Sequence, residues 1–86
     1  MTGSYNVAIK KSAERELRFV PSADLRRITD RIATLAHNPR PAGSEKLSTQ
    51  EQYRVRQGDY RIVYTVDDEH LSVEIVKIGH RREVYR

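Results

Sequence analysis

The chain has 86 residues, and with 16 Lys and Arg against 12 Asp and Glu it carries a formal net charge of +4. A chain this short cannot divide its apolar residues between two cores, so we expect a single domain over residues 1–86. Cysteine is absent and no apolar run approaches the length of a membrane span, which excludes a disulfide framework, a thiolate metal site and a membrane-spanning helix.

The N-terminal part of the chain predicts a strand followed by a first helix. In residues 4–10, Tyr5, Val7 and Ile9 alternate with small or polar residues, as in a strand with one face on the core. We expect Ser12 to be the N-cap of the helix that follows. Pro21 is expected to end that helix and to begin the next segment.

A second helix is predicted before Asn38–Pro39. Its apolar residues recur at i, i+3, i+7 and i+10, which places them in one stripe that faces the core: Leu25, Ile28, Ile32 and Leu35. Its charged residues are expected to point to water: Asp24, Arg26, Arg27, Asp30 and Arg31.

The C-terminal half predicts a sheet. Residues 38–52 hold two prolines and one glycine without a clear period, which indicates a long loop. Residues 53–57, 60–66 and 71–78 alternate as strands joined by two-residue turns at Gly58–Asp59 and Asp68–Glu69. The expected fold is α+β in the order β-α-α-β-β-β: an N-terminal strand, a two-helix hairpin and a three-stranded antiparallel meander, with the helices packed on one face of the sheet.

The turn at Gly58–Asp59 fixes which residues of the first hairpin face each other. With two residues in the turn, Arg56 lies directly opposite Arg61 on the face away from the core. The core face is expected to hold the apolar residues of the three strands: Tyr53, Val55, Ile62, Tyr64, Val73 and Ile75.

Two like charges in such a cross-strand pair cost up to about 1 kcal/mol, and a bound phosphate would remove this cost. The alternative interpretation is that the guanidinium groups turn into water and feel little repulsion. Basic residues also gather here, because Arg54 joins Arg56 and Arg61, and the C-terminal segment adds Lys77, Arg81, Arg82 and Arg86. This grouping favours one basic face and a polyanionic partner over a merely solvated run of charges.

Three segments of the C-terminal half, YRVR, DYRIVY and GHRREVY, give the chain a family resemblance. With the strand, the helix pair and the loop that contains Glu45-Lys46-Leu47, they resemble the RelE/ParE superfamily of toxins from toxin–antitoxin systems. The RelE branch consists of ribosome-dependent endoribonucleases that cut mRNA, with the ribose 2′-hydroxyl as nucleophile and a 2′,3′-cyclic phosphate as product. The resemblance implies the same reaction here, without a metal or a cofactor.

The resemblance also assigns roles to residues that match the family's motif. Arg61 matches the arginine that stabilises charge on the scissile phosphate, Arg81 matches the arginine near the leaving oxygen, and Tyr85 matches the tyrosine that stacks on the substrate base. Arg54 and Arg56 stand where other members often have lysines that hold phosphate or assist deprotonation. Further RNA-binding residues are expected at Lys46, Lys77, Arg82 and Arg86.

The role of general base needs a side chain that can accept a proton near neutral pH. A guanidinium group stays protonated at any ordinary pH, so Arg54 and Arg56 are poor proton acceptors. His80 titrates near neutrality and is the candidate acid or base, although a solvated histidine or one that touches the antitoxin would look the same. His37 at a helix end and His70 in a turn do not have the pattern of metal ligands.

The partners implied by the resemblance are a RelB-like antitoxin, the ribosome and mRNA, with no membrane. Residues 1–11 lack the apolar stretch of a secretion signal, so we expect a cytoplasmic protein. Some relatives continue into a C-terminal helix that the antitoxin displaces. Because this sequence stops at Arg86, we expect neutralisation to work differently, through an antitoxin segment over the basic face or over an apolar groove of the helices.

Two other interpretations stay open. A ParE-like inhibitor of DNA gyrase shares the fold but acts by binding a protein, and it usually lacks the arginine and tyrosine set found here. A non-catalytic nucleic-acid-binding module would need only the basic charge. Cut mRNA with undamaged DNA argues against the first alternative, and turnover argues against the second.

Overall fold

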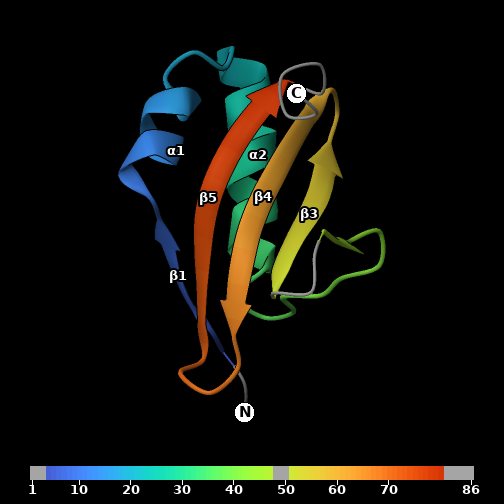
Figure 1. Ribbon diagram of the computed structural model, residues 1–86. Helices are drawn as coiled ribbons and strands as arrows, with labels where there is room; N and C mark the ends of the chain where they lie inside the picture. The colour runs from blue at the N-terminus through green and yellow to red at the C-terminus, as the bar shows by residue number, and fades with distance from the viewer. Residues whose placement is uncertain (1–3, 48–50, 81–86) are drawn as a thin grey trace.

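The computed structural model of the chain describes residues 4–47 and 51–80 (Figure 1). Its elements follow in the order β1 (Asn6–Ile9), α1 (Lys11–Leu17), α2 (Ser22–Thr34), β2 (Glu45–Lys46), β3 (Gln52–Gln57), β4 (Tyr60–Asp67) and β5 (Ser72–His80). Within these ranges no helix is long and apolar enough to cross a membrane. The predicted α+β class and element order are therefore confirmed, with one short strand added between α2 and β3.

The strands form one five-stranded sheet in the order β1-β5-β4-β3-β2. The meander β3-β4-β5 is antiparallel as predicted, but β1 pairs in parallel with β5, so the sheet is mixed. Figure 1 shows α2 lying across one face of the sheet and α1 beside β5. Among the described residues, no helix lies over the other face of β3, β4 and β5.

The start of α1 differs from the prediction at Ser12. The helix begins at Lys11 with Lys10 as its N-cap, and no side-chain hydrogen bond caps it. The Lys10 N–H donates to the Ile75 carbonyl at 2.9 Å, which keeps Lys10 attached to the sheet, while its own carbonyl accepts the N–H of Glu14. The start of α1 is therefore set by the pairing of β1 with β5, and not by a side-chain cap at Ser12.

The second helix has the predicted apolar stripe. Ile28, Ile32 and Leu35 are buried, and Leu25 packs against them. Pro21 precedes the first turn and accepts the Leu25 N–H, as expected of a proline that ends one helix and begins the next. The charged residues lie mostly toward water, but Arg31 is a correction, because it is half-buried and its Nε atom is buried.

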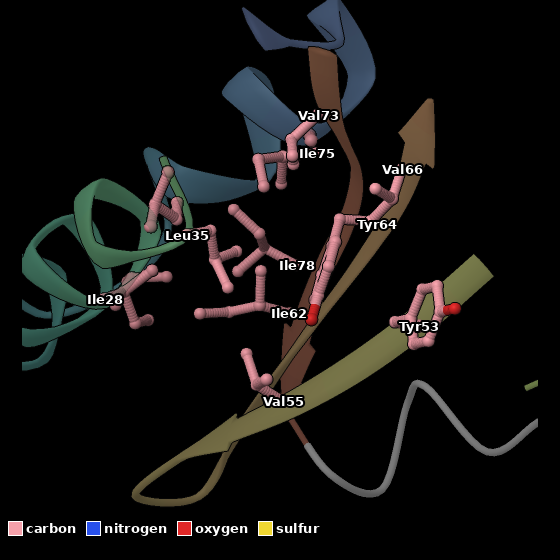
Figure 2. Close-up of a cluster of buried hydrophobic side chains, with 13 residues drawn as sticks. Ile28, Leu35, Tyr53, Val55, Ile62, Tyr64, Val66, Val73, Ile75 and Ile78 are labelled. Carbon is pink, nitrogen blue, oxygen red and sulfur yellow. The ribbon is translucent and has the colours of Figure 1, made fainter. Parts of the chain in front are cut away.

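The core lies between α2 and the sheet and is filled by the alternate residues of the strands (Figure 2). Tyr64 is fully buried there, and its hydroxyl donates to the Pro39 carbonyl at 2.7 Å. Burial raises the pKa of Tyr64 to about 12. The other large buried side chains include those of Ile28, Leu35, Val55, Ile62, Val73, Ile75 and Ile78. The predicted core face of the meander is confirmed.

The turn between β4 and β5 is longer than the predicted two-residue turn at Asp68–Glu69. Asp67 pairs with Ser72, so four residues form the turn, and Leu71 adopts a positive φ of 50°. The Asp67 carboxylate accepts the His70 N–H at 3.2 Å and holds the turn together. A one-residue shift of register then follows at Val63 and Tyr64.

The shift matters because it changes which residues of β5 stand beside β4. Tyr64 pairs with Ile75, whereas Val63 pairs with Lys77 and Arg61 with Gly79. The strand also continues to His80, two residues beyond its predicted end. Gly79 and His80 thus belong to the sheet and not to a tail beyond it.

A charged cluster around Arg40 joins the loop after α2 to the start of β3 and to the turn after β4. The Arg40 guanidinium donates to the Tyr53 hydroxyl at 2.8 Å, to Glu51 at 2.6 Å and to Asp68 at 2.8 Å. Tyr5 donates its hydroxyl to Asp68 at 2.7 Å. Hydrogen bonds from Arg40 hold the pKa of Glu51 down to about 2 and lower that of Asp68.

The ion pairs of this cluster predict how the free energy of unfolding changes at acidic pH. Because the folded-state pKa values of the two carboxyl groups are depressed, their stabilisation is complete above about pH 4.5, the ordinary pKa of a glutamate, and is lost as the pH falls toward 2. We expect Arg40→Met to lower the free energy of unfolding at pH 7 by on the order of 1 kcal/mol and to flatten its fall between pH 4.5 and pH 2. Urea denaturation across this pH range measures both effects.

Arg27→Met is the matched control, because Arg27 is exposed and has only a 4.0 Å ion pair within α2. An Arg40→Met variant whose unfolding free energy follows the wild-type pH curve would show that the cluster does not stabilise the fold.

Candidate functional site

The first hairpin places two arginines directly across from each other, as predicted. Arg56 pairs with Arg61, next to the core pair Val55 and Ile62, so alternation puts both guanidinium groups on the face without a helix. Arg54 lies on the same face, two residues before Arg56 on β3. We call this surface, defined by Arg54, Arg56 and Arg61, the arginine face.

The three arginines differ in exposure. Arg61 is only 5% exposed and Arg54 8% exposed, whereas Arg56 is exposed. A buried guanidinium group is held in one orientation and loses little freedom when it binds an anion, and its interactions are screened less by water than those of a surface charge. The arrangement therefore suits a fixed anion site at Arg61 with a more adaptable cation beside it.

Glu45 is the residue of this region that sequence reasoning missed. It belongs to β2, pairs with Arg54 in the register, and accepts an ion-paired hydrogen bond from the Arg54 guanidinium. It also lines a hollow of about 390 Å³ together with Gly43, Ser44, Arg54 and Arg56. We call this the Glu45 hollow.

The signal for Glu45 was weak in the sequence. The two-residue strand β2 lies in a stretch with two prolines and no period, so nothing in the pattern indicates which side of β3 it joins. Gly43, with a φ of 92°, turns the chain just before β2. The pairing of Glu45 with Arg54, nine residues later in the chain, adds a carboxylate to the arginine face, which the sequence predicts to be purely basic.

Lys46 does not share the arginine face. It pairs with Tyr53, whose side chain is on the core side of β3, and its Nζ atom lies 3.0 Å from Glu51. The hydrogen bond that its ammonium group donates to Glu51 raises the pKa of Lys46. Lys46 therefore lies on the opposite face from the arginines, because adjacent residues of a strand point to opposite faces, and its RNA-binding role stays a prediction.

The end of β5 lies beside Arg61. Gly79 stands opposite Arg61 and has no side chain to cover it. Lys77 pairs with Val63, but its Nζ atom contacts the Glu16 carboxylate of α1 at 3.1 Å. The same carboxylate accepts the Ile78 N–H at 2.8 Å. Glu16 thus fastens α1 to the part of β5 that extends past its pairing with β1.

His80 lies on the other side of the sheet from the arginines. It pairs with Tyr60 across β4 and β5, and the two rings meet edge to face with centroids 5.7 Å apart. By alternation from the buried Ile78, its ring belongs to the side of the helices. This position separates His80 from the arginines beside which its predicted acid or base role would place it.

A second hollow, of about 260 Å³, lies where the end of α1 meets the ends of β4 and β5. Glu16, Phe19 and Val20 line it from the helix side, and Tyr60 and His80 line it from the strands together with Ile78 and Gly79. We call it the α1 pocket. It meets the arginine face at Gly79, which lines the pocket and pairs with Arg61.

Four predicted site residues, Arg81, Arg82, Tyr85 and Arg86, lie outside the described residues.

One group in the described part of the chain has the composition of a metal site. Asp67, Glu69 and His70 place their ligand atoms within 4.8 Å of one another in the exposed β4–β5 turn. The His70 ring contacts Asp67 at 2.8 Å, and this hydrogen bond lowers the pKa of Asp67. The turn lies at the opposite end of β4 from Arg61, so an ion bound there would not reach the arginine face.

The chain is similar over nearly its whole length to toxins of toxin–antitoxin systems. A family model described as the ParE toxin of the type II toxin–antitoxin system parDE matches residues 7–85. The chain is 36% identical to Toxin RelE and 31% identical to Toxin RelG of Mycobacterium tuberculosis. Each alignment covers 95% of this chain, and the two cover 87% and 97% of those relatives, respectively.

Solved structures with the same fold include toxin–antitoxin complexes. The RelBE2 complex from Mycobacterium tuberculosis matches with a TM-score of 0.79 and 28% identity, over 91% of this chain and 99% of that chain. The archaeal RelE–RelB complex from Pyrococcus horikoshii OT3 matches with a TM-score of 0.81 and 28% identity, over 93% and 98%. The isolated Escherichia coli RelE toxin, at 24% identity, shares the fold with a TM-score of 0.80 over 95% and 92%.

Proposed function

Because the chain belongs to the RelE/ParE superfamily of toxins from type II toxin–antitoxin systems, we propose that it is a ribosome-dependent endoribonuclease that cuts mRNA and so inhibits translation. The observation that carries the proposal is the pairing of Arg56 with the buried Arg61 on the arginine face, beside the side-chain-free Gly79. The partners in this proposal are mRNA, the ribosome and a RelB-like antitoxin.

The proposed reaction is a transfer of the phosphoryl group within the RNA. The ribose 2′-oxygen forms a bond to phosphorus, the bond from phosphorus to the 5′-oxygen of the next nucleotide breaks, and the products are a 2′,3′-cyclic phosphate and a 5′-hydroxyl. Negative charge gathers on the nonbridging oxygens in the transition state. Arg61, held in place by burial, stabilises that charge with its planar donors, and Arg56 opposite it holds the same phosphate.

The resemblance supplies two further roles, for residues beyond β5. Arg81 stabilises the charge of the leaving 5′-oxygen, which takes up a proton from water to become the 5′-hydroxyl. Tyr85 stacks on the base next to the cut. Phosphoryl transfer of this kind needs charge stabilisation and a proton acceptor, which side chains supply without a metal. The reaction is therefore proposed to be metal-independent.

The proton of the 2′-hydroxyl needs an acceptor, and we assign that role to Glu45. Arg54 and Arg56 stay protonated and cannot accept a proton, and the His80 ring lies on the other side of the sheet. The Glu45 carboxylate lies in the same hollow as Arg56 and is oriented by Arg54. A carboxylate held next to the phosphate-binding cations has the position that a general base requires.

A gyrase-inhibiting toxin is the second candidate, because the matching family model is described as a ParE toxin. Two features favour the nuclease. The most similar named relatives given above are RelE and RelG, and the arginine face has the paired guanidinium groups that a phosphate requires. Inhibition of gyrase with intact mRNA would support the second candidate.

Loss of Arg61 tests the proposed cleavage. In a translating extract, the wild-type protein is expected to produce new mRNA ends, mapped by primer extension, and Arg61→Ala to lower the rate of cutting about a hundredfold, because one charge-stabilising group is removed. Arg27→Ala, which removes an exposed arginine of α2, is the control and is expected to cut at the wild-type rate.

Ribosome binding, measured by co-sedimentation, separates catalysis from simple binding. Arg61→Ala should still sediment with ribosomes. Equal loss of cutting and of sedimentation would instead favour a non-catalytic binding module, and uncut mRNA with folded wild-type protein would favour the gyrase inhibitor.

Replacement of the carboxylate tests the assignment of Glu45. Glu45→Gln keeps an acceptor for Arg54 but cannot take up a proton, so the cleavage rate is expected to fall roughly 10²-fold or more. The wild-type rate should fall on acidification as the carboxylate is protonated, and this acid-side fall should vanish in the variant. Glu74→Gln, at an exposed carboxylate of β5, is the control. A Glu45→Gln enzyme with the wild-type rate and pH profile would rule out the general base.

A further inference from the structure

The α1 pocket is lined by three ring side chains, those of Phe19, Tyr60 and His80. Phe19, just after the C-terminus of α1, is 87% exposed, the largest exposure among the exposed apolar side chains of the described residues. Tyr60 and His80 form the strand side of the pocket, with their rings edge to face. An exposed phenyl ring opposite a phenol and an imidazole gives the pocket π-faces on both sides.

The polar end of the pocket is fixed by Glu16. Its carboxylate accepts the Ile78 N–H and the Lys77 ammonium, so its position is set by two hydrogen bonds. An ionised carboxylate has about four acceptor positions, which leaves capacity for a donor on a ligand. The pocket thus combines aromatic faces with a fixed hydrogen-bond acceptor.

We propose that the α1 pocket binds one nucleobase of the RNA held at the arginine face. This inference rests on the proposed function and adds a base subsite to it. A base stacks between Phe19 and the Tyr60 ring, and its exocyclic amino group donates to Glu16. Bases that carry an amino group, adenine, cytosine and guanine, therefore bind better than uracil.

The position of the pocket favours RNA as its occupant. Gly79 lines the pocket and pairs with Arg61, and Tyr60 precedes Arg61 on β4, so the pocket and the phosphate site meet at one end of the sheet. A strand of RNA whose phosphate lies at Arg61 can place a neighbouring base in the pocket, because Gly79 belongs to both sites. Single-stranded RNA is commonly read in this way, with unstacked bases placed on aromatic side chains.

The pocket itself does not suit a phosphate, because Glu16 would repel it and the Lys77 ammonium is paired with that carboxylate. The antitoxin remains the competing occupant that the experiment must distinguish.

The chain offers a direct probe, because Phe19 is its only phenylalanine. In full-length protein with ¹³C-labelled phenylalanine, the ring signals are followed by NMR during titration with a 2′-O-methylated oligoribonucleotide, which the proposed reaction cannot cut. We expect a saturable upfield shift from stacking, and a clearly smaller shift with the same oligonucleotide made abasic at every position. Fluorescence anisotropy of the labelled oligonucleotide gives the affinity.

Phe19→Leu is expected to lower that affinity about tenfold, as the loss of one base–aromatic contact does. Leu71→Ala is the control, since Leu71 is also an exposed apolar residue but lies in the β4–β5 turn at the far end of β4. Equal shifts with the abasic oligonucleotide, or an unchanged affinity in Phe19→Leu, would overturn the inference. So would weakened antitoxin binding by Phe19→Leu with unchanged RNA binding, which would assign the pocket to the antitoxin.

These outcomes are separate from the proposed cleavage. Cut mRNA without the stacking shift would contradict the base subsite and leave the proposed nuclease activity in place. The stacking shift without any cutting would support the base subsite and contradict the nuclease activity.

Discussion

The register of the β3–β4 hairpin is the constraint on which the arginine face depends. Gly58 adopts a positive φ of 61°, which permits the tight turn that sets Arg56 opposite Arg61 and Val55 opposite Ile62. A slip by one residue would exchange the two faces, burying arginines and exposing the core. The buried apolar pairs therefore fix the position of the guanidinium groups, so the same interactions that stabilise the fold also prepare the anion site.

The β4–β5 pairing completes this arrangement through its shift of register at Val63 and Tyr64. The shift places Gly79 beside Arg61, so the position of β5 that is paired with Arg61 contributes no side chain against the guanidinium group. Glu16 then secures the same end of β5 through the Ile78 N–H, where β1 no longer pairs with it. The end of the sheet that carries Arg61 is thus held from α1.

Local patterns predicted the parts of the fold that depend on neighbouring residues. The apolar stripe of α2, the alternation of the three long strands, and the Arg56 and Arg61 pair follow from periodicity and from a two-residue turn. The parts that failed depend on distant pairing: the parallel β1–β5 contact moves the start of α1 from Ser12, and the register shift turns His80 away from the arginines. Glu45 joined the site through a two-residue strand without a sequence period. The family resemblance was confirmed, while the roles of Arg81 and Tyr85 stay predictions.

The measurement that tests the account most directly replaces one oxygen atom of the substrate. After the wild-type cut sites are mapped in a translating extract, an mRNA with a single 2′-deoxynucleotide on the 5′ side of one mapped cut is translated with the protein. If the 2′-oxygen attacks a phosphate held at Arg61, cutting at that position disappears while the other sites are cut as before. Continued cutting at the 2′-deoxy position would contradict the proposed chemistry of the arginine face.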